Sequence, residues 1–235
     1  MTAPLLRLQG VSKHFGGFMA LSDVHLDVTP GERLGLIGPN GSGKTTLMNC
    51  IVGSLRHDSG SIQFRDEEIS ALPAYQRTRR GIARSFQIPR PFASMSVLEN
   101  LLVPLEYVGR GKAADAHDIL REMGLAQKAA TPSNQLSQVE LRKLELARAM
   151  AAHPSLLISD EAMAGLSGSE VDEVLAILFR LNESGITVIM IEHILQAVMR
   201  FSQRVICLDA GKIICTGTPN QVVENPQVQK AYLGA

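Results

Sequence analysis

The residues with the clearest chemical meaning form the stretch Gly38-Pro39-Asn40-Gly41-Ser42-Gly43-Lys44-Thr45, which follows the pattern G-x-x-x-x-G-K-T. An apolar, strand-like segment (33–37) precedes it, and a segment with helical spacing (47–52) follows it. Glycines let backbone N–H groups curl around phosphate oxygens, and a helix N-terminus presents unpaired N–H groups to an anion. Lys44 can reach the β- and γ-phosphates, and the Thr45 hydroxyl can bind Mg²⁺. This stretch, hereafter the phosphate loop, therefore predicts a nucleoside triphosphate site rather than a turn without function.

Two carboxylates follow the apolar, strand-like segment 156–159, namely Asp160 and Glu161. In phosphoryl transfer such a first carboxylate holds Mg²⁺, usually through water, and Asp160 fits that role. Glu161 can orient or deprotonate an attacking water. Paired acids at a strand end also occur as solvated caps, but the presence of a phosphate loop favours the functional interpretation.

Two further polar residues also end apolar segments: Gln87 follows segment 83–86, and His193 follows segment 186–191. In an open α/β sheet the strand ends beside a phosphate loop face the ligand. We therefore expect His193 near the site, and Gln87 in contact with Mg²⁺ or water. Taken alone, each signal is weak, because a lone His at a strand end is more often structural.

The charge balance gives no sign of a nucleic-acid partner, since 23 basic residues face 23 acidic ones. The basic cluster of Arg77, Arg79 and Arg80 is interpreted as a solvated helix face. The three cysteines lie among apolar neighbours and are expected to be small buried side chains, in keeping with a reducing cytoplasm; they are Cys50, Cys207 and Cys215.

Neither a secretory leader nor a membrane span is expected. Residues 1–7 lack a charged leader followed by a long apolar run. The longest strongly apolar run, 186–191, has the size of a strand, whereas a membrane-spanning helix needs about 20 apolar residues. A role at a membrane would therefore require the spans of another chain.

Hydrophobic patterning predicts an α/β protein with a largely parallel sheet and helices on its faces. The expected strands are 5–15, 21–28, 33–37, 61–65, 83–86, 156–159 and 187–191, with a hairpin over 205–215. The expected helices are 47–52, 170–181 and 195–201 in the α/β part, and 97–105, 113–123 and 139–152 in an inserted helical lobe. We place that lobe at residues 88–152.

Taken together, these motifs and their order resemble the ABC ATPase family over nearly the whole chain. The resemblance implies a single ABC ATPase domain over 1–235: a P-loop NTPase (RecA-like) core with an antiparallel β part, formed by 1–87 and 153–235, and the helical lobe with a signature loop. It also implies that two such domains sandwich two MgATP head to tail. Phe15 occupies the aromatic position that stacks on adenine in this family, although an ordinary core Phe is the alternative.

Within the family, the sequence is similar to that of the LivG-type subunit of branched-chain amino acid importers. The matching stretches are Phe15-Gly16-Gly17, Gly35 to Gly41, Ala83 to Gln87 and the tail from Asn225 to Gly234. This resemblance implies an ATPase subunit on the cytoplasmic face of the inner membrane that powers amino acid uptake. Its expected partners are a permease, a second ATPase subunit (a copy or a LivF-like chain) and, indirectly, a periplasmic binding protein.

Several alternatives stay open at this point. The chain can serve another substrate, as in lipopolysaccharide export or the uptake of amides or organic acids. It can also be a regulatory subunit that binds ATP but hydrolyses it weakly. A P-loop kinase finds little support, because the long helical lobe and the strand-end His suit an ABC domain better.

The signature loop departs from the family pattern Leu-Ser-Gly-Gly-Gln, since it reads Leu136-Ser137-Gln138-Val139-Glu140. The resemblance implies closure on the γ-phosphate of the other subunit, with Ser137 and the Val139 N–H as donors. The Val139 side chain would crowd the phosphate and loosen that closure. Ser137 and Glu140 also match a capping box, which would turn the carboxylate back to its own backbone.

Two smaller departures concern the contact between subunits, because Ala162 replaces the usual Pro and Ser167 replaces an Asp or Asn. The segment 88–96 after Gln87 is expected to contact a permease helix, or else Phe92 simply packs in the lobe.

The full predicted site has three parts. The catalytic residues are Glu161, His193, Gln87 and Lys44; the Mg²⁺ ligands are Thr45, Gln87 and Asp160; and the ATP contacts are Phe15, Gly38, Pro39, Asn40, Gly41, Ser42, Gly43, Lys44, Thr45, Thr46, Ser137 and Val139.

Overall fold

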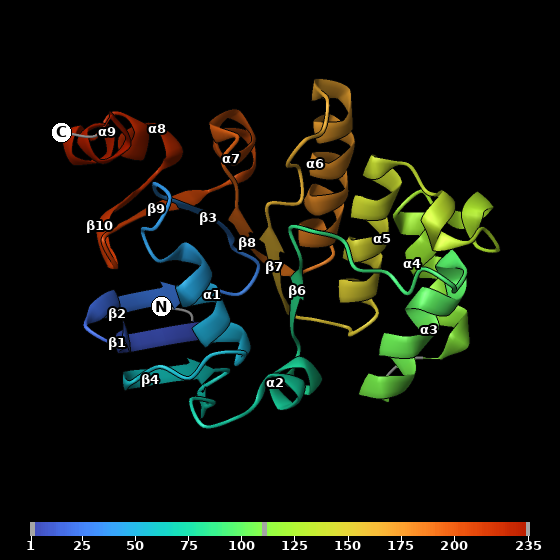
Figure 1. Ribbon diagram of the computed structural model, residues 1–235, viewed down its shortest axis with the longest axis horizontal. Helices are drawn as coiled ribbons and strands as arrows, with labels where there is room; N and C mark the ends of the chain where they lie inside the picture. The colour runs from blue at the N-terminus through green and yellow to red at the C-terminus, as the bar shows by residue number, and fades with distance from the viewer. Residues whose placement is uncertain (1–2, 110–111, 234–235) are drawn as a thin grey trace. The chain divides into compact units, whose positions relative to one another are not determined.

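The structure, a computed structural model, describes residues 3–109 and 112–233 (Figure 1). Its chain forms two compact units, one of Met1–Arg77 with Ile189–Ala235 and one of Thr78–Val188. They are called here the first and the second unit. Gly234, at the end of the tail stretch that resembles the importer family, lies outside the described residues.

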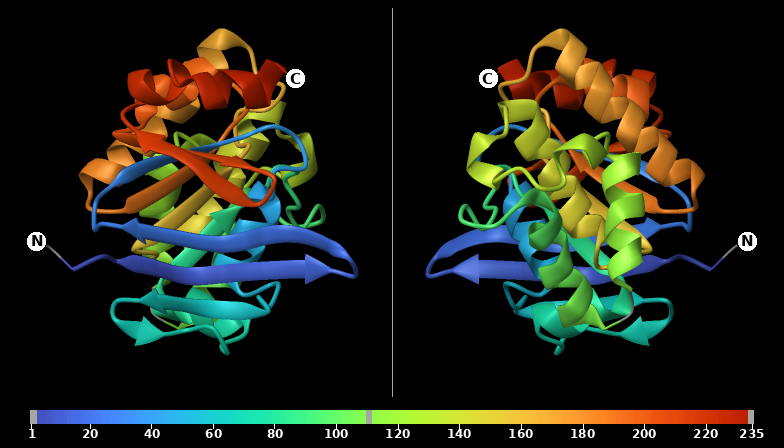
Figure 2. Two further views of the ribbon diagram at one scale, coloured as in Figure 1. Left: turned by 90° about the vertical axis from the view of Figure 1, so that its left-hand side faces the viewer. Right: turned by 90° about the vertical axis from the view of Figure 1, so that its right-hand side faces the viewer.

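The first unit contains an antiparallel sheet with the strand order β2-β1-β4-β5. Its strands are β1 Leu6–Phe15, β2 Phe18–Val28, β4 Ser59–Phe64 and β5 Glu67–Glu68. Figure 2 shows β1 and β2 as two long blue strands that run side by side. Alternate residues of β2, such as Val24, Leu26 and Val28, are buried, which confirms the predicted strand pattern.

The first unit also holds a second set of strands, in the order β10-β9-β3-β8. These are β3 Arg33–Ile37, β9 Arg204–Asp209, β10 Lys212–Gly217 and the end of β8 Thr187–Ile191, in which the division between the units falls. β3 and β9 are parallel, and β9 and β10 form the predicted hairpin. The helices of this unit include α1 Lys44–Val52, α7 Leu195–Phe201, α8 Pro219–Val223 and α9 Pro226–Leu233.

The second unit combines parallel strands with the helices of the predicted lobe. Its strands β6 Ile82–Ser85 and β7 Leu156–Asp160 pair in parallel, with Ser85 opposite Ser159. Its helices include α3 Val97–Val108, α4 Ala113–Glu122, α5 Gln138–Met150 and α6 Gly168–Glu183, with 3-10 turns at Ala126–Lys128 and Ser133–Gln135. Helices α3, α4 and α5 lie inside the range 88–152, although the exact bounds of the lobe stay a prediction.

The interpretation of the basic cluster as a solvated face is wrong for Arg77. Arg77 lies in α2 Ala74–Arg80, a helix that the sequence analysis did not predict, and its side chain is only 1% exposed. Its guanidinium donates to the Cys50 and Ile51 carbonyl oxygens at 2.6 and 2.9 Å, and further bonds reach Leu72 and Ser70. Carbonyl groups in the last turn of a helix lack intrahelical partners, so Arg77 satisfies the end of α1.

Other expectations are confirmed with small differences. Strands 33–37 and 187–191 and helix 195–201 have the predicted bounds. Cys50 and Cys207 are buried, whereas Cys215 is half-buried, so its predicted full burial is wrong. Across residues 3–109 and 112–233, none of the helices has both the length and the apolar character that crossing a membrane requires.

Candidate functional site

The phosphate loop joins β3 to α1 in the first unit, and its glycines are there for steric reasons. Gly38, Gly41 and Gly43 have φ angles of 153°, 78° and 105°. A Cβ atom would lie 2.1 Å from the Leu208 carbonyl oxygen at Gly38 and 2.5 Å from the Ala20 carbonyl oxygen at Gly43. At Gly41, by contrast, nothing lies within 4 Å of that position. The loop thus packs tightly on one side and leaves open space beside Gly41.

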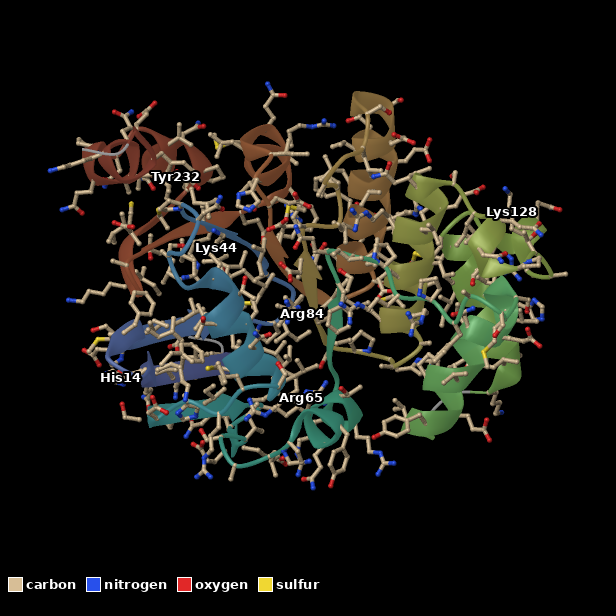
Figure 3. The ribbon with its side chains drawn as sticks, in the orientation of Figure 1. His14, Lys44, Arg65, Arg84, Lys128 and Tyr232 are labelled. Carbon is tan, nitrogen blue, oxygen red and sulfur yellow. The ribbon has the colours of Figure 1, made fainter. Side chains whose placement is uncertain are left out.

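The charges of the phosphate loop suit an anion. The Lys44 ammonium is largely buried and donates to the carbonyl oxygens of Gly38 and Pro39 at 2.7 and 3.0 Å (Figure 3). Helix α1 begins at Lys44 and has no acidic residue in its first turn. The Ser42 hydroxyl is buried with no hydrogen-bond partner among the described residues. A buried cation, a helix N-terminus and an unsatisfied hydroxyl together fit the phosphates of a nucleotide.

The remaining predicted contacts of the first unit are accessible. Thr45 is exposed, so its hydroxyl is available as a ligand, and Thr46 is half-buried. The Phe15 ring is 50% exposed at the end of β1, which excludes the alternative of an ordinary core residue. The Lys13 ammonium lies 5.6 Å from the centroid of that ring. His193 is exposed in the turn between β8 and α7, directly after the buried Glu192.

Tyr232 is a contact of the phosphate loop that the sequence analysis missed. The Gly38 N–H donates to the Tyr232 hydroxyl at 2.8 Å, across 194 positions of the chain (Figure 3). Burial raises the pKa of Tyr232, while the bond from Gly38 acts in the opposite direction. The sequence indicated only that the tail stretch with Tyr232 resembles the importer family. In the structure, this half-exposed Tyr at the end of α9 contacts the phosphate loop, although it lies far from that loop in the sequence.

Asp160 lies at the end of β7 in the second unit and already has a cationic partner. Arg84 of β6 places its Nε atom 3.2 Å from Asp160 Oδ2, and its Nη2 atom donates to the same oxygen (Figure 3). The side chains are 11% and 10% exposed, so water screens this pair little. The guanidinium also lies 5.3 Å from the centroid of the Phe86 ring. The structure therefore pairs the predicted metal ligand with a cation that the sequence analysis did not assign.

Glu161 adopts a backbone conformation that is uncommon for a residue with a side chain. Its φ angle is 47°, in the left-handed region, and such strain is concentrated at functional sites. Its carboxylate accepts a hydrogen bond from Gln87 Nε2. The second unit thus brings together two predicted catalytic residues that are separated by 74 positions.

The capping box at the signature loop is confirmed. The Ser137 N–H donates to Glu140 Oε2 at 2.8 Å, and the Glu140 N–H donates to Ser137 Oγ at 3.4 Å. Lys128 Nζ lies 2.8 Å from the other Glu140 oxygen. The hydrogen bonds from Lys128 and from the Ser137 backbone lower the pKa of Glu140. The carboxylate is thus held by its own helix end and by Lys128, while Ser137 stays exposed and Val139 is half-buried.

The two units carry different parts of the predicted site. The phosphate loop, Phe15 and His193 belong to the first, whereas Gln87, Asp160, Glu161 and the signature loop belong to the second. Among the residues that the structure describes, no group of three or more His, Cys, Asp or Glu side chains could hold a metal ion. Mg²⁺ in nucleotide sites keeps several water ligands and is bound by one or two carboxylates with the substrate phosphates, so the Asp160 carboxylate of the second unit is a ligand of a fitting type.

Comparisons with known proteins agree with this geometry. The sequence model of the ABC transporter family matches residues 21–164, and a model described as "Branched-chain amino acid ATP-binding cassette transporter" matches residues 212–235. The chain therefore belongs to the ABC transporter family and is an ABC-type ATPase subunit. As such, it acts in a dimer and with a membrane permease.

Among its relatives is the high-affinity branched-chain amino acid transport ATP-binding protein LivG of Escherichia coli K12, at 37% identity over 100% of this chain and 99% of LivG. The lipopolysaccharide export ATP-binding protein LptB of Haemophilus influenzae is 35% identical over 98% and 97% of the two chains. The solved ADP form of MJ1267, an ATP-binding cassette of an ABC transporter, superimposes with a TM-score of 0.91 at 31% identity, and the match covers 100% of both chains. The predicted family and fold class are thus confirmed.

Proposed function

We propose that this chain is the ATP-hydrolysing subunit of an importer for branched-chain or related amino acids. The observation that carries the proposal is similarity to LivG over the whole length of both chains, together with the importer-type match at residues 212–235. The second match supports amino acid uptake in particular, because its residues lie outside the range that the general ABC transporter model matches, 21–164.

ATP binding is assigned to the phosphate loop and Phe15. The backbone N–H groups at the start of α1 and the Lys44 ammonium bind the phosphates, and the exposed Phe15 ring stacks on adenine. Thr45, Gln87 and Asp160 would hold Mg²⁺, and the ion would supply positive charge that stabilises the phosphates during hydrolysis. Asp160, which accepts hydrogen bonds from Arg84, would supply the carboxylate ligand.

Hydrolysis is assigned to Glu161, with Gln87 and His193 as helpers. The Glu161 carboxylate accepts a proton from, or orients, the attacking water. Its hydrogen bond from Gln87 Nε2 supports this role, because the donor fixes the position of the carboxylate. Ser137 and the Val139 N–H contact the γ-phosphate that is held by the other subunit of the dimer.

Its partners are assigned from the same resemblance. The chain lies on the cytoplasmic face of the inner membrane, where residues 88–96 contact a permease helix. The second ATPase subunit is a LivF-like chain or a second copy, and a periplasmic binding protein delivers the substrate. The half-exposed Phe92 and the exposed Ile88 support that contact surface, since they present apolar side chains to solvent.

Deletion of the gene in the source organism tests the proposed substrate. Uptake of radiolabelled leucine, isoleucine and valine should fall, and wild-type protein but not Glu161→Gln should restore it. Unchanged uptake of all three, with reduced uptake of another amino acid, an amide or an organic acid, would assign a different substrate. Accumulation of lipopolysaccharide precursors with normal uptake would instead favour the export function of the relative LptB.

The non-glycine signature favours a second candidate, a regulatory subunit that hydrolyses ATP weakly. Val139 carries a branched side chain where the family has glycine, and Glu140 is a carboxylate beside the expected γ-phosphate. The capping box reduces the expected repulsion between Glu140 and the γ-phosphate, because it holds the Glu140 carboxylate against the backbone of its own helix. Steady-state turnover of the purified subunit pair separates the two candidates, since a regulatory subunit would leave the rate unchanged when its Glu161 is replaced by Gln.

A further inference from the structure

Helix α5 presents three charged side chains at intervals of three residues, Arg142, Glu145 and Arg148. This spacing places them along one face of the helix. We call them the α5 charged row. Arg142 and Glu145 are 8% and 5% exposed, and Arg148 is half-buried. All three belong to the second unit, and all three contact the backbone of residues 86–90, which follow β6.

Arg142 bridges two loops that carry predicted catalytic residues. Its Nη1 atom donates to the carbonyl oxygen of Gln87, and its Nη2 atom donates to that of Ala164 at 3.0 Å. Gln87 is the residue whose side chain donates to Glu161, and Ala164 lies three residues beyond Glu161. A single guanidinium therefore fixes the backbone on both sides of the Gln87–Glu161 hydrogen bond.

The rest of the row holds residues 86–92. Arg148 Nη1 donates to the Arg90 carbonyl oxygen at 2.8 Å, and the guanidinium lies 5.2 Å from the centroid of the Phe92 ring. Arg148 also pairs with Glu145 at 2.9 Å. Glu145 accepts hydrogen bonds from the backbone of Arg90 and Phe86, and its burial raises its pKa despite these donors. The row thus satisfies backbone donors and acceptors on a segment that has no regular secondary structure.

Buried polar groups hold the far end of the same segment. Asn100 is fully buried; its Oδ1 atom accepts from the Phe92 N–H at 2.8 Å, and its Nδ2 atom donates to the Phe92 carbonyl oxygen at 3.2 Å. The Ser133 hydroxyl donates to that carbonyl oxygen at 3.0 Å. The backbone of 86–92 is therefore fixed, whereas the side chains of Phe86, Ile88 and Phe92 are 51%, 65% and 42% exposed.

Stability alone does not account for this arrangement. Burying charged groups carries a desolvation penalty, and apolar residues of similar volume often do as well or better in their place. An apolar side chain could not, however, donate to two carbonyl oxygens at once. A guanidinium presents several donors in a fixed fork, so it sets the distance and orientation of the groups that it joins.

From these contacts we infer that Arg142 is a positioning residue for ATP hydrolysis, which acts by fixing the Gln87 and Ala164 backbones to the helix that begins at the signature loop. The α5 charged row thereby ties the backbone of the segment 86–92 to α5. The inference rests on the proposed function only where it concerns hydrolysis.

Arg142→Met tests the inference, with Lys143→Met as the matched control. Lys143 is the next residue of α5 and pairs with Glu173 at 2.6 Å outside the row. We expect Arg142→Met to lower kcat for ATP by on the order of 10- to 100-fold with little change in KM, because small misplacement of catalytic groups has effects of that size. Lys143→Met should keep both constants. A wild-type kcat in folded Arg142→Met would overturn the inference.

A second readout does not depend on activity. Hydrogen–deuterium exchange of peptides that cover 86–92 should accelerate in Arg142→Met and stay unchanged in Lys143→Met. If Arg142→Met does not fold, Arg142→Lys keeps the charge but loses the two-pronged donor, and intermediate losses are expected in both assays. If the wild-type chain does not hydrolyse ATP even with its permease and partner subunit present, the proposed function fails, and exchange alone decides the inference. Unchanged exchange at 86–92 would then refute it.

Discussion

Replacing Arg84 with Met would leave a nearly buried carboxylate without its cation. Arg84 Nε lies 3.2 Å from Asp160 Oδ2, and the side chains are 11% and 10% exposed. Removing one partner of a buried ion pair typically lowers the free energy of unfolding by about 3–5 kcal/mol, because the other charge stays buried. We therefore expect Arg84→Met to lose about 3 kcal/mol, and Tm to fall by about 6–12 °C for a chain of this size.

The pair Arg7–Asp27 gives a matched control within the same chain. It has the same Nε–O distance, 3.2 Å, but its side chains are 34% and 57% exposed. Exposed pairs contribute about 0–1 kcal/mol. Arg7→Met should therefore change Tm by only a few degrees, and the comparison separates burial from geometry.

Urea unfolding of five proteins measures the effect: wild type, Arg7→Met, Arg84→Met, Asp160→Asn and the double variant of Arg84 and Asp160. The double variant should be more stable than Arg84→Met alone, because it removes the unpaired charge as well. The reasoning would be refuted if Arg84→Met were no less stable than Arg7→Met, or if the double variant showed simple additivity.

Two further predictions concern contacts outside the motif residues. Tyr232→Phe removes the acceptor of the Gly38 N–H and should lower the free energy of unfolding by about 1 kcal/mol in urea; an unchanged value would mean that water replaces the hydroxyl. The lowered pKa of Glu140 adds stability above its usual value of 4.5, and this is lost as the pH falls through the folded-state pKa. Between pH 6 and 3, the free energy of unfolding of Glu140→Gln should therefore fall less than that of wild type. Parallel acid-unfolding curves of the two proteins would contradict a lowered pKa of Glu140.

Local sequence patterns were sufficient for much of the fold. The phosphate loop is recognisable because its defining residue types lie within eight consecutive positions, and β3 and β8 have sharp bounds because both are short and largely apolar. The capping box of Ser137 and Glu140 was also predictable, since its two hydrogen bonds join residues three positions apart. In each case the residues that carry the pattern are near neighbours in the chain.

Contacts between distant residues were not predictable in the same way. Arg84 and Asp160 meet only because β6 and β7 pair in one particular register across 76 positions. Arg77 looked like part of a solvated cluster, and its burial depends on carbonyl groups 26 and 27 positions away. The charge spacing of Arg142, Glu145 and Arg148 was visible on α5, but nothing local indicated that their partners lie in residues 86–92.

The positive φ angle of Glu161 belongs to the same group of features. A strand that ends in Asp160 and Glu161 indicates carboxylates at a sheet edge, but it does not indicate how the chain turns there. Helix α2 was missed because its short run, which is rich in polar residues, lacks a strong apolar period. Helices α8 and α9 were also not predicted, because both are too short to show a clear helical period.

We propose that Glu161 activates water in an ATPase that binds nucleotide through the phosphate loop. A comparison of steady-state ATP hydrolysis by wild type and Glu161→Gln, with nucleotide binding and dimer formation followed in the same samples, tests this role. We expect Glu161→Gln to lose turnover by about 100-fold or more, to keep ATP binding and to accumulate an ATP-bound dimer. Hydrolysis by Glu161→Gln at the wild-type rate, or no hydrolysis by wild type even with its permease and partner subunit present, would contradict it.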